Sequence, residues 1–377
     1  MPNLASNQGD LSLDDMPADP PVRYAEQALL GALILEPLRI KTLGSLGPEH
    51  FSVAMHGALF AAMTALTPPA PEVHAREPVW ITALLDRAQP HARGLTAPYL
   101  HTLADSCPEP SHAPAYAQMI VANRARLTIR AAAERLIQAA TDPVLPDPAA
   151  HVLDRTDAVT AVLDDLGRLF PSHPGSLPRT TLPPPPTRDT GVGSNAASEE
   201  QLLLSTAAAR PACLPEMRWL RPEDFTVPLH GVLYRCMASL AYRGDPIDAV
   251  TVLWEAQHHG LITSGATARE VLDLFATPAG SPEHWGEQIL QRSLLHHAHS
   301  TGLHIHAFTN DPSNTPHQLI TGSRRALADL GALRARWHHA TRPPAARQPR
   351  AQPAPASRAG PPAPRPATPA GSPRASR

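Results

Sequence analysis

The stretch GPEHFSVAMHGALFAAM, residues 47–63, recurs as RPEDFTVPLHGVLYRCM at residues 221–237. Eight residues of the first copy keep their identity 174 positions later: Pro48, Glu49, Phe51, Val53, His56, Gly57, Leu59 and Met63. Without gaps, residues 26–63 match residues 200–237 at fourteen of thirty-eight positions. A spacing this long predicts a duplicated domain, because arrays of short repeats have periods of about 20–50 residues.

Apolar residues within each copy follow the spacing of an α-helix. Leu29, Leu30, Leu33 and Ile34 fall on one helical face, and a second stripe runs through Met55, Leu59, Met63 and Leu66. The second copy repeats this stripe as Leu229, Leu233, Met237 and Leu240. Alternating β-branched runs are nearly absent, so the sequence predicts an all-α protein.

Each copy is predicted to end in an antiparallel helical hairpin. Residues 114–140 form a first long helix, the prolines of TDPVLPDP break it, and Asp147 is placed to start the next. The second copy repeats this pattern over residues 283–309 and 315–339. The apolar stripe of such a hairpin must pack on the preceding globule or on another hairpin.

Proline content divides the chain into folded domains and disordered segments. We expect disorder over residues 1–20, a first domain over 21–170, a Pro-rich linker with extended parts over 171–195, and a second domain over 196–340. Residues 341–377 are predicted to be a disordered tail rich in arginine, proline and alanine.

Composition argues against several classes of function. Lys41 is the only lysine and lies outside any GxxxxGK[ST] pattern, so no phosphate-binding P-loop is predicted. Cys107, Cys213 and Cys236 lack the spacing of a metal site or a disulfide framework. No catalytic residue, metal or cofactor is predicted, and His56 and His230 are expected to pack or to form hydrogen bonds. With no signal peptide or apolar membrane span, we expect a cytoplasmic protein without membrane contact.

Residues 25–35, AEQALLGALIL, followed by PEHF and the helix MHGALFAAM, resemble the N-terminal domain of DnaB-type replicative helicases. The second copy, SEEQLLLSTAAA, lacks the glycine and several large apolar residues, so its first helix departs from the family pattern. The resemblance implies a helical globule followed by a hairpin, two such units in tandem, and no RecA-like ATPase domain. In that family, hairpins of neighbouring subunits pair into the collar of a hexameric ring, where primase and loaders dock.

The resemblance implies a non-catalytic DNA-replication scaffold that docks on a DnaB-type helicase, primase or both. The two hairpins are expected to form an intramolecular pseudo-dimer, or to remain free to pair with other subunits, with homo-oligomers as a further possibility. The predicted interface comprises Tyr116, Ile120, Leu127, Leu163, Leu166, Phe170, Trp285, Ile289, Leu330 and Trp337.

The C-terminal tail supports an alternative function. It holds seven arginines and no acidic residue: Arg342, Arg347, Arg350, Arg358, Arg365, Arg374 and Arg377. Arginines spaced in this way can neutralise phosphates and bind DNA without sequence preference. The alternative is therefore a nucleic-acid-binding protein that uses its tail on a structural helical scaffold.

Overall fold

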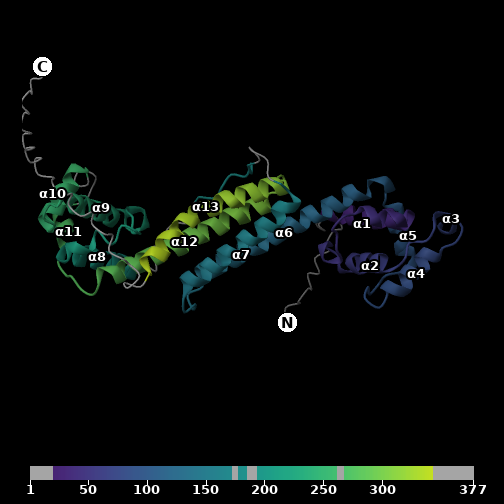
Figure 1. The fold of residues 1–377 in the computed structure, drawn as a ribbon, viewed down its shortest axis with the longest axis horizontal. Coiled ribbons are helices and arrows are strands. Elements are labelled where there is room, and N and C mark those ends of the chain that lie inside the picture. The colour runs from purple at the N-terminus through teal and green to yellow at the C-terminus, as the bar shows by residue number, and fades with distance from the viewer. Residues whose placement is uncertain (1–19, 172–176, 185–192, 261–266, 343–377) are drawn as a thin grey trace, which may run out of the picture. The chain divides into compact units, whose positions relative to one another are not determined.

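A computed structural model of the chain describes residues 20–171, 177–184, 193–260 and 267–342. In these ranges every regular element is a helix (Figure 1), which confirms the all-α prediction. The disorder predicted for the two ends falls almost entirely outside the described residues. Among the helices that are described, none combines the length and the apolar character that crossing a membrane requires.

The first repeat consists of a globule and a hairpin. The helices of its globule are α1 (Pro21–Leu35), α2 (Ala54–Ala65), α3 (Pro71–His74), α4 (Val79–Ala88) and α5 (Ala97–Asp105), with 3-10 turns η2 (Pro37–Thr42), η3 (Pro48–His50) and η4 (Pro110–His112). Its hairpin is formed by α6 (Ala113–Thr141) and α7 (Pro148–Leu169). Asp147 caps α7 as predicted, because its carboxylate accepts a hydrogen bond from the Ala150 N–H at 3.0 Å.

The second repeat follows the same order of elements. The helices of its globule are α8 (Gly193–Ala209), α9 (Pro228–Arg243), α10 (Ala249–His258) and α11 (Ala268–Asp273), with 3-10 turns η5 (Pro211–Cys213) and η6 (Pro222–Asp224). Its hairpin is formed by α12 (Pro282–Asn310) and α13 (Pro316–Ala340). Both hairpins therefore lie within one or two residues of the bounds that the sequence predicts.

The first helix of the second repeat forms despite the missing glycine. In α1, Gly31 lies so close to α5 that a Cβ atom there would be 2.1 Å from the Leu103 carbonyl oxygen. Ser205 occupies the equivalent position of α8, and its hydroxyl donates to the Thr277 carbonyl at 3.0 Å. In α8, the hydrogen bond from Ser205 to Thr277 thus takes the place of the close contact between Gly31 and the Leu103 carbonyl in α1.

The repeated motif of the opening stretch is a packing motif. A Cβ atom on Gly57 would lie 2.7 Å from the Pro48 carbonyl oxygen, and one on Gly231 would lie 2.3 Å from that of Pro222. Glycine is thus the residue that lets each helix approach the preceding 3-10 turn this closely. Aromatic pairs recur as well: the ring centroids of Phe51 and Phe60 are 5.1 Å apart, and those of Phe225 and Tyr234 are 5.3 Å apart.

Two hydrophobic cores hold the repeats together, and α6 belongs to both. Its first turns contribute Ala113, Ala117 and Ile120 to the core of the first globule. Its later turns, from Ile129 onward, join α7, α12, α13 and the second globule in a second core. The first hairpin therefore packs mainly against the second repeat.

Candidate functional site in the paired hairpins

The two hairpins pack against each other within one chain (Figure 1). Helix α6 runs antiparallel to α12, since Arg126 lies beside the end of α12 whereas Ile137 lies farther back along it, beside Gly302. Helix α7 packs on α13. The four helices bury apolar residues from both repeats in a single core, so each hairpin covers the stripe of the other.

A small residue, Gly302, allows α6 and α12 to pack closely. A Cβ atom on Gly302 would lie 2.6 Å from Ile137 Cγ1 and 3.3 Å from the Ala133 carbonyl oxygen. Ala133 is itself the residue 169 positions before Gly302, the spacing that relates the two long helices. Equivalent positions of the two repeats thus meet at the crossing, as expected for a pseudo-twofold pairing.

Arg126 anchors the first hairpin to the tip of the second. Its Nη1 donates to the carbonyl oxygens of Thr309 at 2.9 Å and Asp311 at 2.6 Å. Its Nη2 donates to the carbonyl oxygens of Asn314 at 2.5 Å and Pro312 at 3.3 Å. Because the last carbonyls of a helix have no partner within it, a guanidinium placed here caps α12 and complements its dipole.

The pairs of side chains described next join the two hairpins. In each, the acidic residue lies on the first repeat and the basic residue on the second. Asp157 Oδ2 lies 3.0 Å from Arg334 Nη2, and Asp164 Oδ1 lies 2.8 Å from Arg324 Nη2. Glu134 also lies 3.5 Å from His306. The two arginine pairs are partly exposed, and ion pairs of this kind contribute about 0–1 kcal/mol each. They nevertheless favour pairing of unlike hairpins over pairing of like ones.

The ten predicted interface residues lie in three different environments. Tyr116 and Ile120 belong to the core of the first globule. The second core takes up Leu163, Leu166, Phe170, Trp285, Ile289, Leu330 and Trp337. Leu127, by contrast, is 42% exposed on α6. Sequence reasoning did not select Met119, which lies two turns earlier on the same helix and is 54% exposed.

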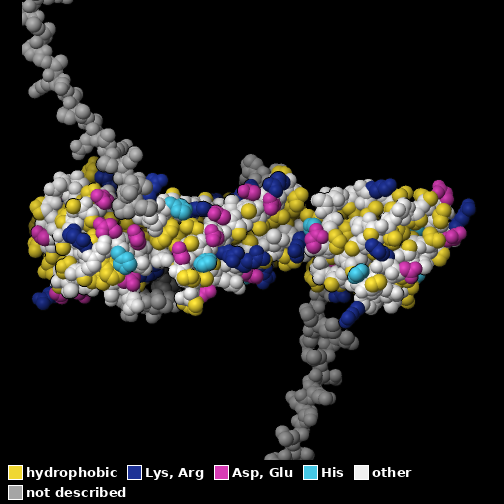
Figure 2. All heavy atoms as spheres, turned by 60° about the horizontal axis from the view of Figure 1, so that its bottom comes forward, with side chains coloured by type: hydrophobic (Ala, Val, Ile, Leu, Met, Phe, Trp, Pro, Cys, Tyr) yellow, Lys and Arg dark blue, Asp and Glu magenta, His cyan; other side chains and the backbone are white. Residues whose placement is uncertain are grey.

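Of the seven arginines predicted to bind nucleic acid, the structure describes one. Arg342 is described and exposed. Arg347, Arg350, Arg358, Arg365, Arg374 and Arg377 lie outside the described residues. Elsewhere, basic and acidic side chains are interspersed on the face drawn in Figure 2, with apolar side chains between them.

A buried pair of glutamate and histidine recurs in both globules. Glu26 Oε2 lies 2.7 Å from His56 Nδ1, and the Ser52 N–H donates to Glu26 Oε1 at 2.5 Å. In the second repeat, Glu200 Oε2 lies 2.9 Å from His230 Nδ1. The repeated histidines therefore form hydrogen bonds, and their partners are 30 residues away. The sequence contained the signal, since both members recur at the same spacing of 174.

Hydrogen bonding keeps these two glutamates ionised. Burial acts to raise the pKa of Glu26, but the hydrogen bonds from His56 and from the Ser52 N–H outweigh it and hold that pKa below its usual value. The pKa of Glu200 is lowered in the same way by His230 and by the N–H groups of Thr226 and Val227. Each carboxylate ties the start of one helix to the middle of another, which is a structural role.

Cys213 and Cys236 are both buried in the second globule. Burial raises the pKa of Cys213 and of Cys236 to about 11, so both thiols stay protonated near neutral pH. Across the part of the chain that the structure describes, no three His, Cys, Asp or Glu side chains are grouped to hold a metal ion.

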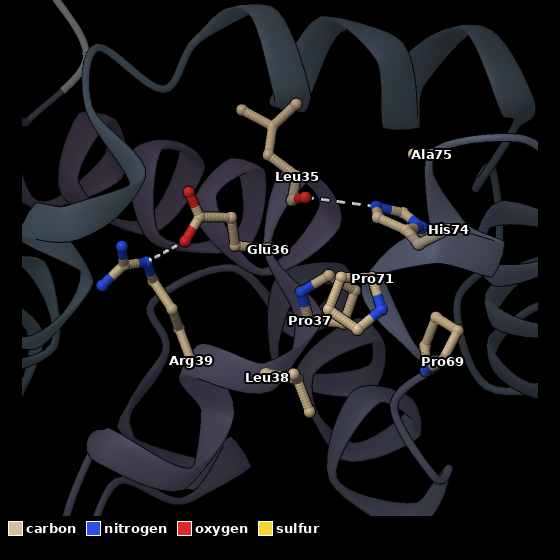
Figure 3. Close-up of a pocket in the computed structure, with 9 residues that line it drawn as sticks. All are labelled: Leu35, Glu36, Pro37, Leu38, Arg39, Pro69, Pro71, His74 and Ala75. Atoms are coloured by element: carbon tan, nitrogen blue, oxygen red, sulfur yellow. Dashed lines mark hydrogen bonds and ion pairs between the residues drawn. The ribbon is translucent and has the colours of Figure 1, made fainter.

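A groove of about 480 Å³ lies at the end of α1 in the first globule (Figure 3). Its walls are mainly apolar, from Leu35, Pro37, Leu38, Pro69 and Pro71. Two polar contacts border it: Arg39 Nε donates to Glu36 Oε2 at 2.5 Å, and His74 Nε2 donates to the Leu35 carbonyl at 3.1 Å. Glu36 and Arg39 are thus paired with each other, whereas His74 Nδ1 is buried without a hydrogen-bond partner.

The family model of the DnaB-like helicase N-terminal domain matches the chain twice, over residues 19–122 and 194–289. The two matches together cover more than half of the chain. Each match contains one globule and ends within the first long helix of a hairpin, so most of both hairpins lies beyond it. Comparison with solved structures gave no match.

Proposed function

The chain belongs to the family of DnaB-like helicase N-terminal domains, and from this premise we propose that it is a non-catalytic scaffold of DNA replication. It docks on a replicative helicase of the DnaB type, on primase, or on both. The matched domain is the non-catalytic part of such helicases, and the chain holds two copies of it. The scaffold joins its partners and leaves nucleotide hydrolysis to them.

The main support for this proposal is that the two hairpins pair within one chain. Each hairpin covers the apolar stripe of the other, so neither needs a neighbouring subunit to bury it. Partners must then contact surfaces that remain exposed after pairing. On the first hairpin, Leu127 and Met119 provide such a surface along α6.

Replacing Leu127 by glutamate is expected to reduce binding of helicase or primase by about tenfold or more, as for an apolar contact at the centre of an interface. The side chain is 42% exposed, so the fold should tolerate the charge. The measurement is retention of purified helicase and primase by immobilised full-length protein. Val73→Glu is the matched control, because Val73 is 45% exposed on the first globule, away from the hairpins.

The assay distinguishes an error in the proposed docking surface from an error in the proposed function. Capture that is unchanged by Leu127→Glu would show that partners use another face. Failure to capture either partner with the unaltered protein would contradict the proposed function. Charged substitution of Ile120 tests folding instead, since that side chain is fully buried.

A nucleic-acid-binding role is the second candidate, supported by the seven arginines and the absence of acidic residues in the tail. It requires retention of DNA without any protein partner, with an affinity that falls steeply as salt increases. In the same assay, DNA retention lost on replacing the seven arginines by glutamine, together with no capture of helicase or primase, would favour this role.

A further inference from the structure

The tip of the second hairpin holds a segment of the linker. Residues 177–184, here called the strap, have no regular secondary structure, and the first four of them lie on the turn between α12 and α13. Thr180 Oγ1 donates to Asp311 Oδ2 at 2.6 Å, and Gln318 Nε2 donates to the Leu177 carbonyl at 3.1 Å. The linker therefore makes specific contacts where it passes this tip.

Asn314 is the centre of these contacts and is only 2% exposed. Its Oδ1 accepts from the Arg179 N–H at 3.3 Å, and its Nδ2 donates to Thr180 Oγ1 at 2.7 Å and to the Phe308 carbonyl at 2.9 Å. Two of these three hydrogen bonds are made to the strap. A buried amide without hydrogen-bond partners costs free energy. The Asn314 side chain is therefore placed to bind a peptide backbone and a hydroxyl.

The strap also fits the tip by shape. A Cβ atom on Gly322 of α13 would lie 2.3 Å from Pro178 Cγ, so the proline ring occupies the space that a side chain would take. Phe308 lies on another side of this space, with its ring 3.1 Å from the same point. Glycine in the middle of a helix is less favourable than alanine, and here it leaves room for the proline ring.

The first hairpin has a similar turn without this receptor. The Val144 N–H donates to Asp142 Oδ1 at 2.9 Å, as the Ser313 N–H does to Asp311 Oδ1 at 2.9 Å. Leu145 stands where the second turn has Asn314, 169 positions later. The polar groups that hold the strap are thus specific to the second tip.

We propose that the tip of the second hairpin is a binding site for an extended, proline-containing peptide, and that residues 177–184 are its resident ligand. Asn314 forms hydrogen bonds with the backbone and a hydroxyl of the peptide, and the proline of the peptide fills the space over Gly322. Bound in this way, the linker fastens the end of the first repeat to the second hairpin, on the same tip that Arg126 caps. Through the strap, the linker stabilises the pairing of the two hairpins in addition to connecting the two repeats.

The first test uses Gly322→Ala in the full-length chain, because the added methyl group must displace Pro178. Trypsin cleavage after Arg179 should accelerate at least about tenfold, since cleavage follows the population of the released strap. Gly331→Ala is the matched control: it lies on the same helix, and a Cβ atom there meets nothing within 4 Å. Circular dichroism establishes that both variants keep their helices.

The second test supplies the ligand in trans. A fluorescent peptide with the sequence of residues 177–184, LPRTTLPP, is titrated into the unaltered chain and into a Pro178→Asp/Thr180→Val chain, whose own strap is weakened. We expect binding to the variant, and loss of that binding when Asn314→Ala is added. Binding to neither chain, equal binding to both, or equal cleavage of Gly322→Ala and Gly331→Ala would overturn the proposal.

Discussion

Replacing Glu26 by alanine is expected to lower the free energy of unfolding by about 3–5 kcal/mol, because each buried donor left without an acceptor costs about 1–3 kcal/mol and the lost side chain leaves a cavity. The substitution leaves the fully buried His56 and the partly buried Ser52 N–H without their acceptor. Denaturant unfolding followed by circular dichroism measures the loss. Glu200→Ala should have a similar effect, because the second repeat contains the same arrangement.

Glu36→Ala is the control, since this residue forms an exposed pair with Arg39 and should cost less than about 1 kcal/mol. A loss at Glu26 no larger than that at Glu36 would show that the buried pair does not hold the globule together.

The same two carboxylates give the stability a dependence on pH. Their pKa values are lowered in the folded state, so their contribution is present above the unfolded-state pKa, about 4.3. It is lost as pH falls through the lower, folded-state pKa. The unaltered protein should therefore lose stability in acid below about pH 4, and the Glu26→Ala/Glu200→Ala variant should lose less over that range.

Arg126→Leu is expected to have the second largest effect, a loss of about 3 kcal/mol, because hydrogen bonds from a charged donor contribute about 1.5–3 kcal/mol. Carbonyl oxygens at the end of α12 and in the following turn would lose the donor that the guanidinium provides. Leucine is an informative replacement, since Leu295 stands 169 positions later at the equivalent site of α12.

Two further variants show whether geometry or charge is responsible. Arg126→Lys keeps the charge but cannot reach several carbonyl oxygens at once, so its stability should lie between those of the unaltered protein and Arg126→Leu. Arg124→Leu, at an exposed position of the same helix, should change stability by less than about 0.5 kcal/mol. Equal losses in Arg126→Leu and Arg124→Leu would contradict the role of Arg126.

Local patterns in the sequence were enough to predict the all-α class, the duplication and the long helices of both hairpins. Helical spacing, the prolines that end a helix and the cap at Asp147 act over a few residues, so they can be read directly. The apolar stripe was less informative about docking. An exposed apolar residue such as Leu127 and a buried residue such as Leu163, which packs in the chain's own core, follow the same helical spacing.

Contacts that are unique to one repeat could not be predicted. Arg126 meets the tip of the second hairpin more than 180 residues away, and Asn314 meets Arg179 and Thr180 about 135 residues away. Neither contact recurs in the other repeat, so the comparison of the two copies gives no hint of it. The Glu–His pairs do recur, and pairing the two sets of repeated polar residues would have found them.

The central claim is that the two hairpins pair within a single chain. It is tested most directly by replacing Glu134 and His306, which lie 3.5 Å apart on α6 and α12, by cysteine in a chain whose Cys107, Cys213 and Cys236 are changed to alanine. A short bismaleimide crosslinker is added at micromolar protein concentration, and the products are separated by mass. The pairing described here predicts an internally crosslinked monomer. Crosslinks found only between two chains, or none at all, would contradict it.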